Sequence, residues 1–280
     1  MRKVFSRAEF IASGRTAKEL RWALSKGAVH RISHGWYVEG EAQPTAFERQ
    51  LGRMLAADGE ATSLVAAQLL SLDGITVPAE LLPRRRRTPV SAELITVDRI
   101  RCTNALQVLI DIAPLVDDLV WEQALESALH KQLLKLEELT DIVPLLTRAR
   151  VCGAPRIKRV LALRPANAPP TESLLETLMV QLARKVDGVP EPDRQVVVSQ
   201  SDGRFVARVD LAWIDDGGFG ELDGQGHKDQ PVYDAVRQTN VVIATGWLPG
   251  RFTWREVHRN PIPTGRRLAA FIATARSRRR

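Results

Sequence analysis

Residues 209–227 have the sequence Val209-Asp-Leu-Ala-Trp-Ile-Asp-Asp-Gly-Gly-Phe-Gly-Glu-Leu-Asp-Gly-Gln-Gly-His227. Apolar residues alternate with polar ones around Asp210, which predicts a β-strand over residues 204–213. The Asp and Gly residues at 215–218 favour a tight turn, because they tolerate positive φ in a short loop. The segment is therefore predicted to form a β-hairpin.

Three carboxylates of this hairpin converge in the predicted register. With the turn centred on residues 216–217, Asp210 lies opposite Asp223 and diagonal to Glu221, and both acids of the second strand share one face. Like charges in such positions destabilise a strand pair, and a bound cation resolves the repulsion. Because oxygen ligands at this density suit Mg²⁺ or Mn²⁺, all three acids are candidate metal ligands. The alternative is a solvated acidic face, which a longer loop with a different register would leave.

The composition is that of a globular protein with a basic balance. The chain has 280 residues, with 40 Lys and Arg against 33 Asp and Glu, a formal net charge of +7. The length permits more than one domain, and the charge favours a polyanionic partner such as nucleic acid. Cys102 and Cys152 are too few for a zinc cluster or a disulfide framework, and no apolar run could span a bilayer. We therefore expect a cytoplasmic protein without a membrane partner.

The amino-terminal end carries most of the excess positive charge. Capping patterns that begin at Ser6 and Thr16 predict two short helices, each followed by a glycine. On the second helix, Lys18 and Arg21 lie on the side opposite the apolar residues, so the outer face is basic. Residues 28–38 then predict two short strands. Helix, turn, helix and β-hairpin is the element order of a winged helix, in which the second helix enters the major groove of DNA.

A set of residues in this region also matches a known family. The set consists of Gly14-Arg-Thr16, Leu20, Gly27, Val29-His-Arg-Ile32 and Gly35-Trp-Tyr37. It resembles the amino-terminal winged-helix domain of AbiEi-type antitoxins, the autoregulatory partners in type IV toxin–antitoxin systems. The resemblance implies a DNA-binding domain over residues 1–40, double-stranded DNA as a partner, a cognate toxin as a second partner, and DNA contacts at Arg15, Lys18, Arg21 and Arg31.

The middle of the chain is predicted to be a mostly helical domain over residues 41–163. The run Thr103-Asn-Ala-Leu-Gln-Val-Leu-Ile-Asp111 resembles the domain that follows the winged helix in AbiEi-like proteins, and Thr103 is the expected helix cap. A small sheet is expected within residues 74–97, where Arg84-Arg-Arg-Arg87 either contacts phosphate or is only solvated. Apolar residues at helical spacing predict helices over residues 45–57, 62–72, 104–112 and 117–134.

The Pro-rich residues 164–170 predict a linker, and residues 171–280 a further domain. Its predicted order, with Thr171 capping the first helix, is helix, three strands, helix, strand and closing helix. This order resembles the PD-(D/E)XK nuclease core, in the branch near the very-short-patch-repair endonucleases, and implies an α/β/α sheet. The residues that carry the resemblance are Glu172, Glu176, Val209–Trp213, Glu221–Gly224, His227, Asp234, Arg237, Gly246-Trp247 and Arg251–Trp254.

The resemblance implies metal-dependent hydrolysis of DNA phosphodiester bonds. Asp210 and Glu221 would hold the Mg²⁺ or Mn²⁺ ion together with Asp223, which stands where the family motif has a lysine. Either His227 or Glu172 would accept the proton of the attacking water. No Walker loop, nucleophile elbow or His-Glu-x-x-His motif occurs, so those chemistries have no support in the sequence.

Two function hypotheses follow for this multidomain α+β chain. The first is a DNA-binding, metal-dependent endonuclease. The second is an AbiEi-type antitoxin and transcriptional regulator whose nuclease-like domain is inactive. Leu248-Pro-Gly250 is expected to interrupt the last strand, and the interruption would indicate a decayed active site.

Overall fold

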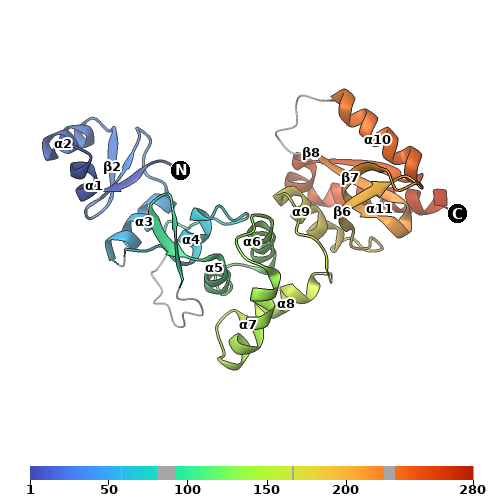
Figure 1. Cartoon of the computed structure of the whole chain (residues 1–280), viewed down its shortest axis with the longest axis horizontal. Coiled ribbons are helices and arrows are strands. Elements are labelled where there is room, and N and C mark those ends of the chain that lie inside the picture. Colours follow the sequence, from blue (N-terminus) through green and yellow to red (C-terminus); the bar gives the residue numbers. More distant parts are fainter. Residues whose placement is uncertain (58, 81–92, 166, 224–230, 280) are drawn as a thin grey trace. The chain divides into compact units, whose positions relative to one another are not determined.

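The computed structural model describes residues 1–57, 59–80, 93–165, 167–223 and 231–279 of a mixed α/β chain (Figure 1). The chain divides into two compact units. The amino-terminal unit comprises Met1–Ala128 and Gln132–Leu161, and the carboxy-terminal unit comprises Leu129–Lys131 and Ala162–Arg280. None of the helices described combines the length and the apolar character needed to cross a lipid bilayer.

The amino-terminal unit begins with two short helices on a three-stranded sheet. The capping box predicted at Ser6 and the cap predicted at Thr16 are confirmed, and Thr16 also forms a full capping box, because each side chain accepts from the backbone N–H of a glutamate three residues later. The predicted helices and hairpin are confirmed, and strand β1, which the sequence analysis did not predict, joins the hairpin in the antiparallel order β1-β3-β2. The elements are β1 (Val4–Ser6), α1 (Arg7–Ala12), α2 (Ala17–Ser25), β2 (Val29–Ser33) and β3 (Trp36–Glu39).

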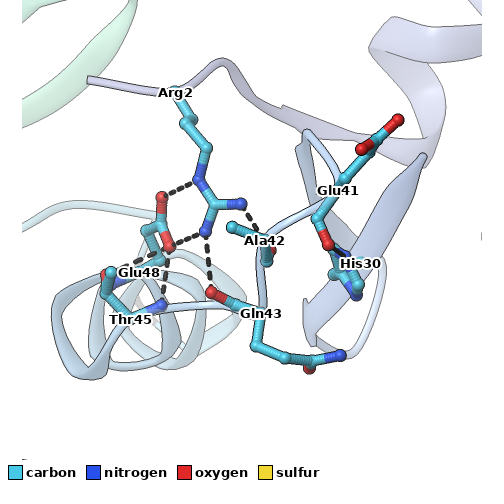
Figure 2. A network of polar contacts seen from close by, with 7 residues as sticks. All are labelled: Arg2, His30, Glu41, Ala42, Gln43, Thr45 and Glu48. Carbon is cyan, nitrogen blue, oxygen red and sulfur yellow. Dashed lines mark hydrogen bonds and ion pairs between the residues drawn. The ribbon is translucent and has the colours of Figure 1, made fainter. Parts of the chain in front are cut away.

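Helix α3 (Ala46–Ala57) packs directly on this sheet, so contacts span the predicted boundary between residues 40 and 41. Gly52 of α3 permits the close approach, since a Cβ atom there would lie 2.7 Å from Cγ1 of Ile32. A second link is polar. Arg2 donates from Nε and Nη2 to the carboxylate of Glu48 at 2.9 and 2.5 Å (Figure 2). Its Nη1 donates to the carbonyl oxygen of Ala42, and its Nη2 to that of Gln43.

Glu48 is 4% exposed, and its carboxylate accepts hydrogen bonds from Arg2 and from Thr45. Burial opposes its ionisation, but Arg2 and the hydrogen bonds from Thr45 outweigh burial and lower its pKa. A carboxylate with a lowered pKa stabilises the fold at neutral pH, and this stabilisation is lost as pH falls through the lowered pKa.

We predict that Arg2→Met lowers the melting temperature by several degrees, because it leaves the Glu48 charge buried without its counter-ion. Arg2→Met combined with Glu48→Gln should recover part of the loss. Lys3→Met is the matched control, since Lys3 is 60% exposed and lies 3.7 Å from Glu39. Thermal denaturation at pH 7 and pH 4 checks the prediction. Equal melting temperatures for the Arg2 and Lys3 variants would contradict it.

The remainder of the amino-terminal unit is mostly helical, as predicted. The expected cap at Thr103 is wrong, because the Asn104 side chain accepts the hydrogen bond from Gln107 N that begins the helix. The Arg84–Arg87 run lies outside the described residues. The elements are α4 (Ser63–Leu69), β4 (Leu94–Val97), β5 (Ile100–Thr103), α5 (Ala105–Ile112), α6 (Asp118–His130), α7 (Leu136–Arg148) and α8 (Ala154–Leu163), with β4 and β5 antiparallel.

The carboxy-terminal unit contains a four-stranded sheet in the order β6-β7-β8-β9, of which only the β8–β9 pair is parallel. The predicted sequence of elements is confirmed. The first helix starts later than expected, because Ser173 and not Thr171 caps it. The elements are α9 (Leu174–Ala183), β6 (Asp193–Ser199), β7 (Phe205–Trp213), a 3-10 turn (Ile214–Asp216), β8 (Gly218–Asp223), α10 (Pro231–Thr245), β9 (Leu248–Thr253), a π turn (Arg255–Arg259) and α11 (Pro261–Arg279).

Two apolar clusters hold the helices of this unit against the sheet. Helices α9 and α11 share one cluster with Leu211 and Trp213 of β7. Helix α10 contributes Val241 to the other, which contains Ala207 and Val209 of the same strand. The predicted single apolar row of β7 is therefore divided between two clusters, and the division falls at Asp210.

The predicted hairpin forms with a different register. Trp213 pairs with Gly218 and Leu211 with Gly220, so the connection begins two residues earlier than the turn predicted. Continuing this register by one residue brings Asp210 opposite Glu221. The predicted pairing of Asp210 with Asp223 is wrong by two residues, a shift that leaves all three acids on the same face.

The predicted interruption at residues 248–250 is also wrong, because Leu248, Pro249 and Gly250 lie within β9. Leu248 N donates to the carbonyl oxygen of Gly217 beside β8. Since successive N–H groups of a strand point to opposite sides, the nitrogen of Pro249 faces the open edge, where no donor is needed. Gly250 makes room for Phe271 of α11, which a Cβ atom there would approach to 3.0 Å. Pro249 is thus compatible with an edge strand, and Gly250 has a packing role.

Candidate active site

Side chains from α9, β6, β7, β8 and α10 meet where the apolar row of β7 divides. Val196 pairs with Val209 and Arg194 with Leu211, which places Gln195 across from Asp210. Gln195 has φ +52°, in the left-handed region that non-glycine residues rarely adopt. Strained residues of this kind are concentrated at functional sites. We call Glu172, Glu176, Asp210 and Glu221, which meet here, the carboxylate cluster.

Glu176 is the most heavily hydrogen-bonded member of the cluster. It is 4% exposed, and it accepts hydrogen bonds from Gln195 Nε2 at 2.7 Å, Glu172 N at 2.9 Å and Ser173 Oγ at 3.0 Å. Burial raises its pKa despite these donors, and the nearby Asp210 charge adds to the rise. The sequence analysis named Glu176 only as part of a resemblance. The capping pattern Ser173-Leu-Leu-Glu176 is the signal that could have identified it as an inward-facing residue.

Asp210 is partly buried and accepts a hydrogen bond at Oδ2 from Leu222 N, 2.9 Å away on β8. Burial raises its pKa, and Glu172 adds to the rise, while the Leu222 N–H, Arg237 and Arg208 oppose it. Strand β7 thus places Asp210, whose pKa is raised, near Glu176, whose pKa is also raised. Such pairs are frequent at active sites.

Glu221 extends from β8 and is 4% exposed. Its Oε2 lies 2.5 Å from Nη2 of Arg237, a residue of α10 for which the sequence analysis proposed no role. Glu172, the predicted proton acceptor, is more open and pairs with Arg208 at 2.7 Å, with 38% of its side chain exposed. Asp210 and Glu221 are therefore brought together, with Glu172 at the rim.

The other predicted site residues are not gathered here. Asp223 lies 3.6 Å from Arg251, and 36% of its side chain is exposed. His227 lies outside the described residues. Within the part of the chain that the structure describes, no group of three or more His, Cys, Asp and Glu residues is arranged to hold a metal ion.

The predicted DNA-contacting residues lie on the surface of the amino-terminal unit. Lys18 and Arg21 are exposed on α2, together with Trp22, which is 62% exposed. Arg15 lies 5.1 Å above the Phe10 ring and 3.6 Å from Glu39. Arg31 extends from β2 over the Tyr37 ring at 5.8 Å. All four cations are accessible to a partner, and the two on α2 form no ion pair with any residue described.

Comparison with protein-family models, with curated proteins and with solved structures found no match to this chain.

Proposed function

We propose that the protein binds duplex DNA and hydrolyses its phosphodiester bonds at the carboxylate cluster. One observation carries this proposal: Glu176, Asp210 and Glu221 come from three separate elements, and Asp210 lies between Glu221 of β8 and the strained Gln195, which donates to Glu176. Burial raises the pKa of Glu176 and of Asp210. Placing these carboxyl groups together therefore lowers the stability of the fold, which apolar residues at the same positions would not do. Costly convergence of this kind is typical of a functional site.

The element order supports the two family proposals. In the carboxy-terminal unit, a helix, three antiparallel strands, a helix and a parallel strand follow in the order of the PD-(D/E)XK nuclease core. In the amino-terminal unit, two helices and a hairpin follow in the order of a winged helix. We therefore propose that α2 contacts DNA, with Arg15, Lys18, Arg21 and Arg31 as its basic contacts.

The residues present fit a divalent cation. Mg²⁺ is commonly held by one or two carboxylates, with waters and substrate phosphates completing its shell, so a cage of three acids is not required. Asp210 and Glu221 would hold it, with Asp223 as the further candidate. When bound, the ion would polarise the phosphate and make the attacking water more acidic. Glu176 fixes the geometry of the cluster, and Glu172 or His227 accepts the proton.

We predict that Mg²⁺ or Mn²⁺ raises the melting temperature of the DNA-free protein by several degrees, since the ion binds only the folded state and relieves carboxylate repulsion. The same ions should permit nicking or cutting of plasmid DNA. Differential scanning calorimetry and a plasmid cleavage assay check this, with Ca²⁺ and EDTA as controls. Absence of any metal effect on stability and on cleavage would remove the nuclease proposal.

The second candidate is an AbiEi-type regulator that binds DNA or a toxin partner and does not cleave DNA. It is favoured by the ion pairs of Glu221 with Arg237 and of Asp223 with Arg251, which already neutralise two of the proposed metal ligands. Metal stabilisation without cleavage would favour this candidate.

A further inference from the structure

Arg237 of α10 is in direct contact with the buried Glu221. Its Nη2 lies 2.5 Å from Glu221 Oε2, and its Nη1 lies 3.5 Å from the carbonyl oxygen of Arg208 on β7. One guanidinium group thus bridges the two strands that carry Asp210 and Glu221.

Strand β8 does not supply this charge itself. The residue two positions after Glu221, on the same face, is the acid Asp223. Arg237 comes instead from α10, the helix that follows β8 in the sequence. Its side chain is 33% exposed, whereas the Glu221 side chain is only 6% exposed. The arginine can therefore rotate toward solvent while the glutamate stays fixed in its strand.

A divalent cation and Arg237 compete for Glu221. Both are attracted to the same buried carboxylate, and two positive groups held that close together repel each other. A guanidinium released from a carboxylate pairs well with phosphate, because its forked donors match both anions. A buried glutamate left without any positive partner would be strongly destabilising.

We propose that Arg237 is an exchangeable counter-ion of Glu221. In the metal-free protein it neutralises Glu221, and when a divalent cation takes its place it turns to a phosphate oxygen of the DNA. The exchange keeps a positive partner on Glu221 in both states, and couples cation binding to the capture of substrate. This inference rests on the proposed nuclease function and assigns Arg237 as a positioning residue for its substrate.

The test measures Mn²⁺ binding and DNA cleavage separately in the full-length protein. Calorimetric titration with Mn²⁺ alone should give a dissociation constant about tenfold lower for Arg237→Met than for wild type, because the competing charge is gone. The cleavage rate at saturating Mn²⁺ should fall about a hundredfold, because the phosphate loses its donor. Arg237→Lys keeps the positive charge but lacks the paired N–H donors of the guanidinium. It should therefore retain near wild-type Mn²⁺ affinity and still lose most of its cleavage rate.

Arg204→Met is the charge-matched control, since Arg204 is 74% exposed and pairs with Asp202 at the far end of β7. It should leave the Mn²⁺ affinity unchanged. Equal Mn²⁺ affinity in wild type and Arg237→Met, or a parallel loss of affinity and cleavage, would overturn the exchange while leaving the nuclease proposal in place. Failure of the wild type both to bind Mn²⁺ and to cut DNA would instead remove the nuclease proposal and the exchange with it.

Discussion

Asp210→Asn should reduce metal-dependent DNA cleavage by about a thousandfold, because it removes the negative charge that holds the cation, and the cation stabilises the transition state. The substitution keeps the shape of the side chain, and the amide oxygen can still accept the hydrogen bond from Leu222 N. Duplex binding through the amino-terminal unit should be retained. A plasmid cleavage assay and a gel-shift assay with the same DNA check the two parts.

The same variant should be more stable than the wild type in EDTA at neutral pH. Burial raises the pKa of Asp210, so between the unfolded and folded pKa values the folded state binds more protons. Stability therefore falls as pH rises through that window, and asparagine avoids this loss. We expect a gain of a few degrees in melting temperature at pH 7 that disappears at acid pH. Unaltered cleavage by Asp210→Asn would contradict the assignment of the cluster as the active site.

Lys18→Ala combined with Arg21→Ala should weaken duplex binding by one to two orders of magnitude near 0.1 M salt, a rough figure for two lost phosphate contacts. It should also lower the slope of log K against log salt by about two, because each lost contact releases about one counter-ion fewer. Titrations over a range of KCl concentrations measure both quantities. Lys26→Ala, at the C-cap position that follows α2, is the control.

The double variant distinguishes DNA binding through α2 from DNA binding through the part of the chain that follows Leu163. Unchanged binding by the double variant, together with loss of binding when the chain is truncated after Leu163, would show that α2 is not the DNA contact. A parallel decrease across unrelated sequences is expected, since phosphate contacts carry no sequence information.

Local signals in the sequence predicted much of the fold. The capping boxes at Ser6 and Thr16 involve residues only three apart, so sequence neighbours determine both helix starts. Helix α10 was predicted with its observed bounds, because Pro231 and Gly246 mark its two ends. Strand β1 was not predicted, since three residues are too few to show a period.

The candidate site depended on contacts that local patterns do not encode. The hairpin register follows from how a 3-10 turn fits residues 214–216, and the composition of the turn did not distinguish this from a tighter loop. The sequence analysis selected Glu172 as the proton acceptor, and the hydrogen bonds that hold Glu176 inside the cluster come from Gln195, a residue of another element. The left-handed conformation of Gln195 has no sequence signal at all, since glutamine does not favour it.

Pro249 has a consequence for how this protein behaves in concentrated solution. A sheet whose outermost strand presents a full row of amide donors is a template for pairing with another chain, and so for aggregation. The nitrogen of Pro249 faces that open side of β9 and has no hydrogen to offer, and the charged Arg251 follows two residues later with an exposed side chain. Replacing this proline with valine would restore a donor to the row, so the substitution is expected to favour self-association even where the folded monomer is unaltered.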